Sequence, residues 1–238
     1  MNDPTDSFIR AFEEMVQEVN KLAAMANSHS FEIERASERN GVVRRNRAVL
    51  MYIRDVRNAL QHPKHRSGGH AICVSDAFLG EVCALLSALK NPATANSVGV
   101  SRRQIRTASL TDRLGDLADE MKRSGFSHLP ILDDSDAVIG VFNEAAIFDF
   151  LWSVAETIVG RQMQVKDVLA HCRLGANHTE TFTFVTPGTL LDDLVDVFLR
   201  VNSPTTRVGA AFVTASGRKS EPLQRLITPW DVLAISAK

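Results

Sequence analysis

Residues 128–146 read His-Leu-Pro-Ile-Leu-Asp-Asp-Ser-Asp-Ala-Val-Ile-Gly-Val-Phe-Asn-Glu-Ala-Ala, and they carry the pattern from which the fold of the second half of the chain is predicted. Two short apolar runs, at 129–132 and 138–142, flank the polar segment 133–136. Apolar runs of this length are typical of buried strands, and Asp and Ser favour the turn between them. The stretch therefore predicts two strands joined by a turn and followed by a helix.

The same order of elements occurs twice in the second half of the chain. The first copy has a short strand at 105–108 and a helix before the hairpin, and it ends with a helix near residue 151. The second copy begins with a strand at 182–185, and residues 185–235 then repeat helix, strand, polar loop, strand and helix. A βαββα unit of this size cannot bury both faces of its own sheet, so we expect the two copies to pack together.

The repeated unit resembles the CBS domain, whose signature is an apolar strand, a turn, and a Gly-apolar-apolar-Thr/Ser-x-x-Asp element that leads into a helix. Residues 128–133 and 140–146 carry this pattern in the first copy, and residues 210–214 and 226–231 carry it in the second. The resemblance covers residues 100–238 and implies a tandem CBS pair. It also implies a regulatory protein whose small ligand, most often an adenosine-type nucleotide such as AMP, ADP or ATP, binds in a cleft between the two copies.

Thr228 and Asp231 of the second copy are the residues that the resemblance marks for this ligand. Thr228 is expected at the end of a strand, after Ile227, and Asp231 in the first turn of the last helix. A hydroxyl, open backbone N–H groups and a carboxylate then converge, which suits a phosphate and two ribose hydroxyls. The alternative is that the two side chains only cap the helix, because Thr and Asp are favoured at that position in any case.

The first copy departs from the signature, because Asn143 stands where Thr or Ser is usual and Ala146 stands where Asp is usual. We therefore expect one nucleoside site, around Asp231, and one degenerate or empty site in the first copy. Arg106 and Arg207, each near the start of a predicted strand, are candidate partners for a phosphate, with surface solubility as the alternative for each. The predicted ligand-binding residues are Ile227, Thr228, Asp231, Arg207, Arg106, Asn143 and His128.

Residues 1–92 show a helical pattern instead of short strands. Apolar side chains recur at steps of three and four residues along the first helix, which indicates one buried face. A stretch rich in Pro, Ser and Asn at 91–99 separates the two halves. The predicted fold class is α+β, with an all-α helical bundle followed by two βαββα repeats. The predicted boundaries are 1–92 for the bundle, 93–103 for a linker and 104–238 for the CBS pair, with repeats at about 104–155 and 165–236.

Residues 57–62, Arg-Asn-Ala-Leu-Gln-His, resemble the R[ND]xxxH motif of HEPN domains, small helical bundles that include many metal-independent RNases. The resemblance implies Arg57, Asn58 and His62 as catalytic residues, in a cleft that two protomers assemble as a homodimer. A His suits the general base that activates a 2′-OH, and an Arg stabilises charge on the phosphate. The alternative is a non-catalytic module for dimerisation or partner binding, in which these residues are structural, so enzymatic activity stays open.

The charge of the chain is neutral in total but uneven along the sequence. The 27 Lys and Arg residues against 28 Asp and Glu give a net charge of −1, which excludes a chain that is basic throughout. Residues 1–34 hold seven acidic and two basic side chains, whereas residues 35–66 hold nine basic and two acidic ones. The basic segment favours RNA as a partner, and a solvated face compensated by the acidic first helix is the alternative.

The remaining composition argues against a metal, a disulfide or a membrane. Cys73, Cys83 and Cys172 share no CxxC spacing, and the three histidines of 62–70 lack a helical i, i+4 pair and nearby carboxylates. No apolar run reaches the length of a membrane span, and the acidic residues at the start are unlike a signal peptide. We expect a cytoplasmic protein with no metal site and no membrane partner.

Overall fold

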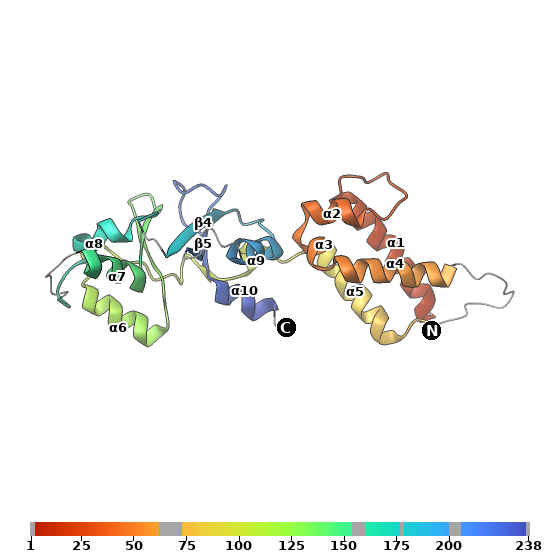
Figure 1. Cartoon of the computed structure of the whole chain (residues 1–238), viewed down its shortest axis with the longest axis horizontal. Coiled ribbons are helices and arrows are strands. Elements are labelled where there is room, and N and C mark those ends of the chain that lie inside the picture. Colours follow the sequence, from red (N-terminus) through yellow and green to blue (C-terminus); the bar gives the residue numbers. More distant parts are fainter. Residues whose placement is uncertain (1–2, 62–72, 154–159, 177–178, 200–205, 237–238) are drawn as a thin grey trace. The chain divides into compact units, whose positions relative to one another are not determined.

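The computed structural model describes residues 3–61, 73–153, 160–176, 179–199 and 206–236. The chain divides into two compact units, and Figure 1 draws the helices of the first unit in red to yellow. The first unit contains residues 1–93 together with 190–193, and the second contains residues 94–189 and 194–238.

The described part of the first unit is helical. Its helices are α1 (Pro4–Leu22), α2 (Ile33–Arg39), α3 (Gly41–Arg45), α4 (Arg47–Gln61) and α5 (Asp76–Lys90). α1 begins at Pro4 because the Asp3 carboxylate accepts a hydrogen bond from the Thr5 N–H at 2.8 Å, and a proline suits the first turn since it has no N–H to satisfy. Ser75 caps α5 in the same way, accepting from the Phe78 N–H at 3.2 Å.

An apolar core holds these helices together. α1 packs against α2, α4 and α5, so the long first helix contacts most of the unit. Phe8, Met15 and Val19 of α1 are fully buried in this core, as are Leu50 and Ile53 of α4. The apolar face predicted for the first helix is confirmed. Burying each such side chain stabilises the fold by about 1.5–3 kcal/mol, and this packing is what keeps helices as short as α2 and α3 folded.

The second unit contains two structural repeats. The first repeat consists of α6 (Leu114–Ser124), β2 (Leu129–Leu132), β3 (Val138–Phe142) and α7 (Glu144–Ser153). The second consists of β4 (Glu180–Val185), α9 (Leu191–Leu199), β5 (Arg207–Val213), β6 (Arg225–Ile227) and α10 (Pro229–Ser236). The short 3-10 turn η1 (Ala95–Ser97) and β1 (Val100–Ser101) precede both repeats, and α8 (Val165–Cys172) lies between them.

The two repeats have corresponding strand pairings. β2 and β3 are antiparallel, with Leu129 opposite Phe142. In the second repeat β5 pairs in parallel with β4 and antiparallel with β6, and β1 extends the sheet to the order β1-β6-β5-β4. The strand predicted at 105–108 is reduced to Ala108, which forms a parallel bridge with Ile131. It is short because the Ile105 N–H donates to the Ser101 carbonyl in a turn.

The repeats pack against each other, as the sequence predicts. Val138 and Val141 of β3 share one buried cluster with Phe212 of β5 and Leu226 of β6. α8 belongs to the core of the first repeat, where its Val165, Val168 and Cys172 join residues of α6 and α7. Gly140 makes this packing possible, because a Cβ atom there would lie 2.6 Å from the carbonyl oxygen at the end of α8. The signature glycine is therefore required by a close approach of backbone to backbone.

Candidate functional site

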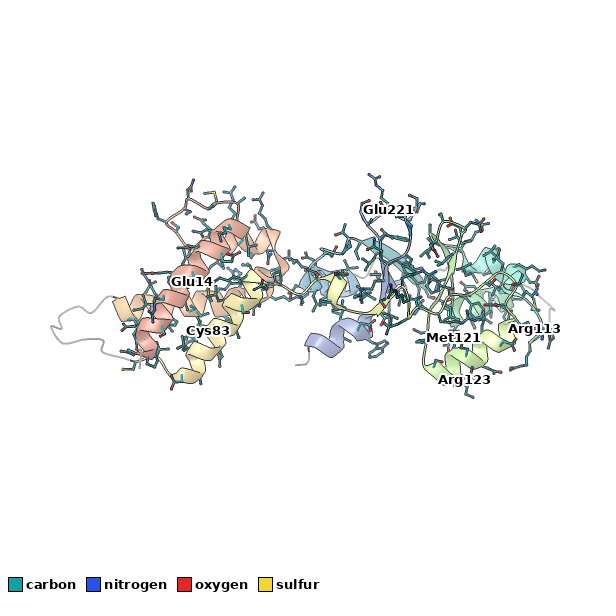
Figure 2. The ribbon with its side chains drawn as sticks, turned by 180° about the vertical axis from the view of Figure 1, so that it is seen from behind. Glu14, Cys83, Arg113, Met121, Arg123 and Glu221 are labelled. Carbon is teal, nitrogen blue, oxygen red and sulfur yellow. The ribbon has the colours of Figure 1, made fainter. Side chains whose placement is uncertain are left out.

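A cavity of about 660 Å³ lies in the second unit, beside the hairpin of the first repeat. The end of α6, the segment 125–128, the start of α7 and Glu180 of β4 surround it. Met121, which Figure 2 labels on α6, forms part of its apolar wall. Phe126 also lines the cavity and is 39% exposed, so a ligand can pack against its ring.

Glu180 is the polar centre of the cavity. Its Oε2 accepts hydrogen bonds from His128 Nε2 at 3.0 Å and from Asn143 Nδ2 at 2.8 Å. The hydrogen bond from His128 lowers the pKa of Glu180, and that from Asn143 adds to the effect, while partial burial opposes both. Nε2 of His128 donates to this carboxylate, and Nδ1 of the same ring lies within hydrogen-bond distance of Ser127 Oγ, at 2.7 Å. Glu180 is therefore an ionised, oriented hydrogen-bond acceptor.

Asn143 connects this carboxylate to the start of α7. Its side chain is almost fully buried, and its Oδ1 accepts from the Ala146 N–H at 2.8 Å while its Nδ2 donates to Glu180. Both halves of the amide are thus used. Ala146 is itself buried in the core of the first repeat, at the position where the signature has an Asp. Two carboxylates line the cavity, Glu144 at the start of α7 and Glu180 from the second repeat.

Gly209 leaves the space that the Glu180 and His128 side chains occupy. A Cβ atom at residue 209 would lie 2.9 Å from Glu180 Oε2 and 3.0 Å from His128 Nε2. Glu180 and Gly209 belong to the second repeat, whereas His128 belongs to the first. The polar side of the cavity is therefore built at the junction of the two repeats.

The two predicted phosphate partners lie outside the lining of this cavity. Arg106 Nε contacts both carboxylate oxygens of Glu120 at 3.0 Å, and its guanidinium also lies 3.5 Å from Asp112. Its charge is thus paired within the protein. Arg207 is exposed at the start of β5, in register opposite Glu180 of the parallel partner strand.

In the second repeat, Thr228 and Asp231 bond to each other at the start of α10. Asp231 Oδ2 accepts from both the backbone N–H and the hydroxyl of Thr228 at 2.7 Å, and the Asp231 N–H donates to the Thr228 carbonyl. Ile227, the last residue of β6, is fully buried. This geometry is a helix cap, and none of the three residues lines the cavity described above.

In the first unit, Arg57 and Asn58 lie on α4, and His62 lies outside the described residues. The Arg57 guanidinium carbon is 5.4 Å from the centre of the Phe12 ring, and its Nη1 donates to Asn58 Oδ1 at 3.3 Å. Arg57 Nε is buried and has no hydrogen-bond partner in the described part of the chain. Arg57 therefore packs against the helical core with much of its side chain.

The sequence patterns do not point to Glu180, Ser127 or Phe126. Glu180 follows Asn143 by 37 residues and stands in the other repeat, so no local pattern joins the two. Ser127 precedes the first signature strand directly, and that adjacency is the one signal that could have pointed to it.

Within the described residues, no group of three or more His, Cys, Asp or Glu side chains is arranged to hold a metal ion. No helix among the described segments has both the length and the apolar character that a membrane crossing requires.

Comparison with known proteins supports the assignment of the first repeat. The family model of the CBS domain matches residues 97–153. No curated protein matches the chain.

Three solved structures illustrate the similarity that remains at low identity. CBSX2 in complex with AMP is 14% identical, with 60% of this chain and 96% of that chain covered and a TM-score of 0.42. A CBS-domain pair with bound AMP from Klebsiella pneumoniae is 17% identical, with coverage of 61% and 99% and a TM-score of 0.42. A hemolysin-like protein containing a CBS domain from Oenococcus oeni PSU is 16% identical, with coverage of 60% and 90% and a TM-score of 0.42.

Proposed function

We propose that the second unit binds an adenosine-type ligand, a nucleotide or its nucleoside, in the cavity of the first repeat and thereby regulates the helical unit. The observation that carries this proposal is the Glu180 carboxylate, which two side chains of the first repeat hold at the side of a cavity with an aromatic wall. A carboxylate accepts hydrogen bonds from ribose hydroxyls or a base amino group, and Phe126 supplies a surface for the base. The resemblance of the repeats to CBS domains favours the same ligand class.

Regulation follows from where the cavity lies. A ligand that bonds to Glu180 contacts a residue of the second repeat while it is surrounded by α6 and α7 of the first. Its binding energy therefore depends on how the two repeats are held against each other. A ligand that binds one arrangement more tightly shifts the population toward it, which is the physical basis for a sensor.

Thermal unfolding with added AMP, ADP, ATP, adenosine and cyclic dinucleotides tests the proposal. A ligand at 100 times its dissociation constant stabilises the unit that binds it by about 2.7 kcal/mol, so its unfolding midpoint should rise by several degrees. Glu180→Ala should abolish the rise, whereas Glu221→Ala, on the hairpin of the second repeat, should keep it. A midpoint that no ligand moves, or a rise that survives in Glu180→Ala, contradicts the proposal.

A nucleotide site in the second repeat, with Thr228, Asp231, Ile227 and Arg207, stays a separate prediction. The mutual bonds of Thr228 and Asp231 equally satisfy a helix cap, so the two readings differ only in their response to ligand. If a nucleotide binds there, Asp231→Ala removes part of the stabilisation that ligand provides. If the residues only cap α10, the variant lowers the midpoint by the same amount with and without ligand.

For the helical unit, metal-independent RNA cleavage by Arg57, Asn58 and His62 stays a proposal, and a non-catalytic module for dimerisation or partner binding is the alternative. The packing of Arg57 on Phe12 favours a structural part for that arginine. Incubation of purified protein with RNA in the absence of metal, beside His62→Ala, distinguishes the two. Cleavage by the native chain and not by the variant supports the enzyme. Equal cleavage by both, or none by either, rules it out.

A homodimer is the assembly that we propose. α7 exposes Phe148 and Trp152, whose rings stack with centres 6.3 Å apart, and α10 exposes Trp230 and Leu233. Both helices follow the last strand of their repeat, so a second copy of the chain offers a matching pair of apolar helices. Sedimentation should give twice the mass of the chain, and Trp152→Glu should reduce it. A monomer at micromolar concentration contradicts this assembly.

A further inference from the structure

Ser127, His128 and Glu180 form a continuous hydrogen-bonded series at the cavity of the first repeat. Ser127 Oγ lies 2.7 Å from His128 Nδ1, and His128 Nε2 lies 3.0 Å from Glu180 Oε2. All three residues line the cavity, and Ser127 is exposed there. A serine within hydrogen-bond distance of a histidine that a carboxylate orients is the arrangement of an activated nucleophile.

The imidazole ring of His128 is held in place from two sides. Its side chain is 10% exposed, and the ring packs edge-on against Phe182 with centres 5.9 Å apart. Asn143 Nδ2 fixes the Glu180 carboxylate at 2.8 Å, and this carboxylate accepts from His128 Nε2. When Nε2 of a neutral ring donates, the lone pair is on Nδ1, the atom that faces Ser127. His128 can therefore take the proton of the Ser127 hydroxyl.

The space in front of Ser127 suits a small apolar group. The cavity volume of about 660 Å³ is within the range of small-molecule sites. Apolar side chains form much of its wall, among them Met121, Phe126, Phe142 and Ile147. A short acyl chain can pack against these side chains while its carbonyl carbon stays within reach of the serine.

The start of α7 offers hydrogen-bond donors at the same cavity. The Ala146 N–H is used by Asn143 Oδ1, whereas the N–H groups of Glu144 and Ala145 donate no hydrogen bond within the described part of the chain. Glu144 and Ala145 both line the cavity. Open N–H groups at a helix start suit an oxygen that becomes negative during a reaction.

From this geometry we infer that Ser127 is a nucleophile toward esters of short apolar acyl groups, with His128 as its general base. Ser127 Oγ attacks the carbonyl carbon while its proton passes to His128 Nδ1. The bond from that carbon to the alcohol oxygen then breaks, the alcohol leaves with the proton, and the acyl group stays on Ser127. Water that gives a proton to His128 adds to the acyl carbon, the acid is released, and the proton returns to Ser127 Oγ. No nucleotide is needed for this reaction, so it goes beyond the proposed function.

Covalent labelling of the full chain with diisopropyl fluorophosphate tests the nucleophile. Ser127 Oγ should displace fluoride and bond to phosphorus, so peptide mass spectrometry should find the label on Ser127. His128→Ala should slow the labelling at least about 100-fold, the lower end of what a general base contributes. Ser127→Ala should lose the label and the hydrolysis of p-nitrophenyl butyrate, and its exposed side chain makes this variant safe for folding even if His128→Ala folds poorly.

Ser153 is the matched control, because it also lies beside a histidine. Its Oγ is 3.3 Å from His171 Nε2, but its hydroxyl donates to the Phe150 carbonyl at 2.8 Å. Among the described residues no carboxylate bonds to His171, whose ring packs edge-on against Phe150. Ser153 should carry no label, and Ser153→Ala should hydrolyse the ester at the native rate.

Glu180 acts through His128 and is a positioning residue. Glu180→Gln keeps the shape of the side chain and removes the charge that stabilises the protonated ring. It should therefore lower kcat for the ester and leave KM unchanged, whereas damage to the cavity wall would raise KM.

Four outcomes overturn the inference. They are no label on Ser127, equal rates of labelling at Ser127 and Ser153, labelling of Ser127 that His128→Ala does not slow, and a labelled chain that does not hydrolyse the ester. None of them decides whether a nucleotide binds, because the thermal shifts with native chain and Glu180→Ala measure that separately.

Discussion

Replacing Asn143 by Ala removes two hydrogen bonds with separate purposes. One caps α7 through Oδ1, and the other holds the Glu180 carboxylate through Nδ2. Asn143→Ser keeps an oxygen that can cap α7, but the serine side chain is too short to reach Glu180. This variant should therefore lose only the hydrogen bond to Glu180. The two variants therefore separate the cap from the site.

The magnitude follows from the two bonds. Loss of an N-cap costs about 1 kcal/mol, and loss of a hydrogen bond to a charged group costs about 1.5–3 kcal/mol. The second figure is reduced here because the Glu180 side chain is 30% exposed and solvent screens it. We expect the second unit to lose about 2–3 kcal/mol in Asn143→Ala and about 1–2 kcal/mol in Asn143→Ser.

Urea denaturation followed by circular dichroism measures these losses, with hydrogen exchange of β2 and β3 to assign the transition to the second unit. The pH dependence adds a second readout. Because the pKa of Glu180 is lowered in the folded chain, its contribution is present above the unfolded-state pKa and is lost as pH falls through the folded-state value, below the ordinary 4.5. The stability that Asn143→Ser loses relative to the native chain should therefore become smaller as the pH falls from about 6 to about 3. An equal loss in both variants, or a deficit that does not change with pH, would contradict the two separate roles of the Asn143 side chain.

Three further substitutions or reactions test other parts of the structure. Gly140→Ala should destabilise the second unit by about 1–3 kcal/mol in urea, since its Cβ would meet a backbone oxygen at 2.6 Å, and an unchanged midpoint would contradict the close packing of α8. Gly209→Ala should weaken ligand binding more than stability, because its Cβ would meet side-chain atoms of Glu180 and His128 and displace the Glu180 carboxylate. Calorimetry measures the affinity and thermal unfolding measures the stability, and an unchanged affinity would contradict this expectation. Burial raises the pKa of Cys172 to about 12, so mass spectrometry after iodoacetamide at pH 8 should show labelling of the two exposed cysteines of the first unit and none at Cys172 until the chain is denatured.

The repeats of the second unit were predictable because their signals are local. A strand of four or five apolar residues, an Asp-rich turn and a helix appear within residues 128–151, and the structure has β2, β3 and α7 there. Asp136 adopts a positive φ of 61° in the turn, and Asp133 Oδ1 accepts from the Ser135 and Ala137 N–H groups. Turn chemistry of this kind depends on neighbouring residues alone, so the sequence contains it.

The site was predictable only in part. The signature directed attention to Asn143 and His128, and both have a place at the cavity. It also directed attention to Asp231, whose carboxylate the structure shows bonded to Thr228, and it indicated a degenerate site in the first repeat because Ala146 lacks a carboxylate. The Glu180 carboxylate lies at this cavity but belongs to the second repeat, so comparing each copy separately with the signature does not detect it.

Local sequence patterns are enough to predict where the chain changes from helices to strands, that one unit occurs twice, and which apolar faces are buried, because neighbouring residues carry each of these patterns. Which polar groups meet depends on tertiary packing. Packing of the two repeats places Glu180 beside His128 and Asn143, and the missing side chain of Gly209 leaves room for them. Hydrogen bonds act over about 3 Å, so the chemistry of the cavity depends on distances that only folding sets.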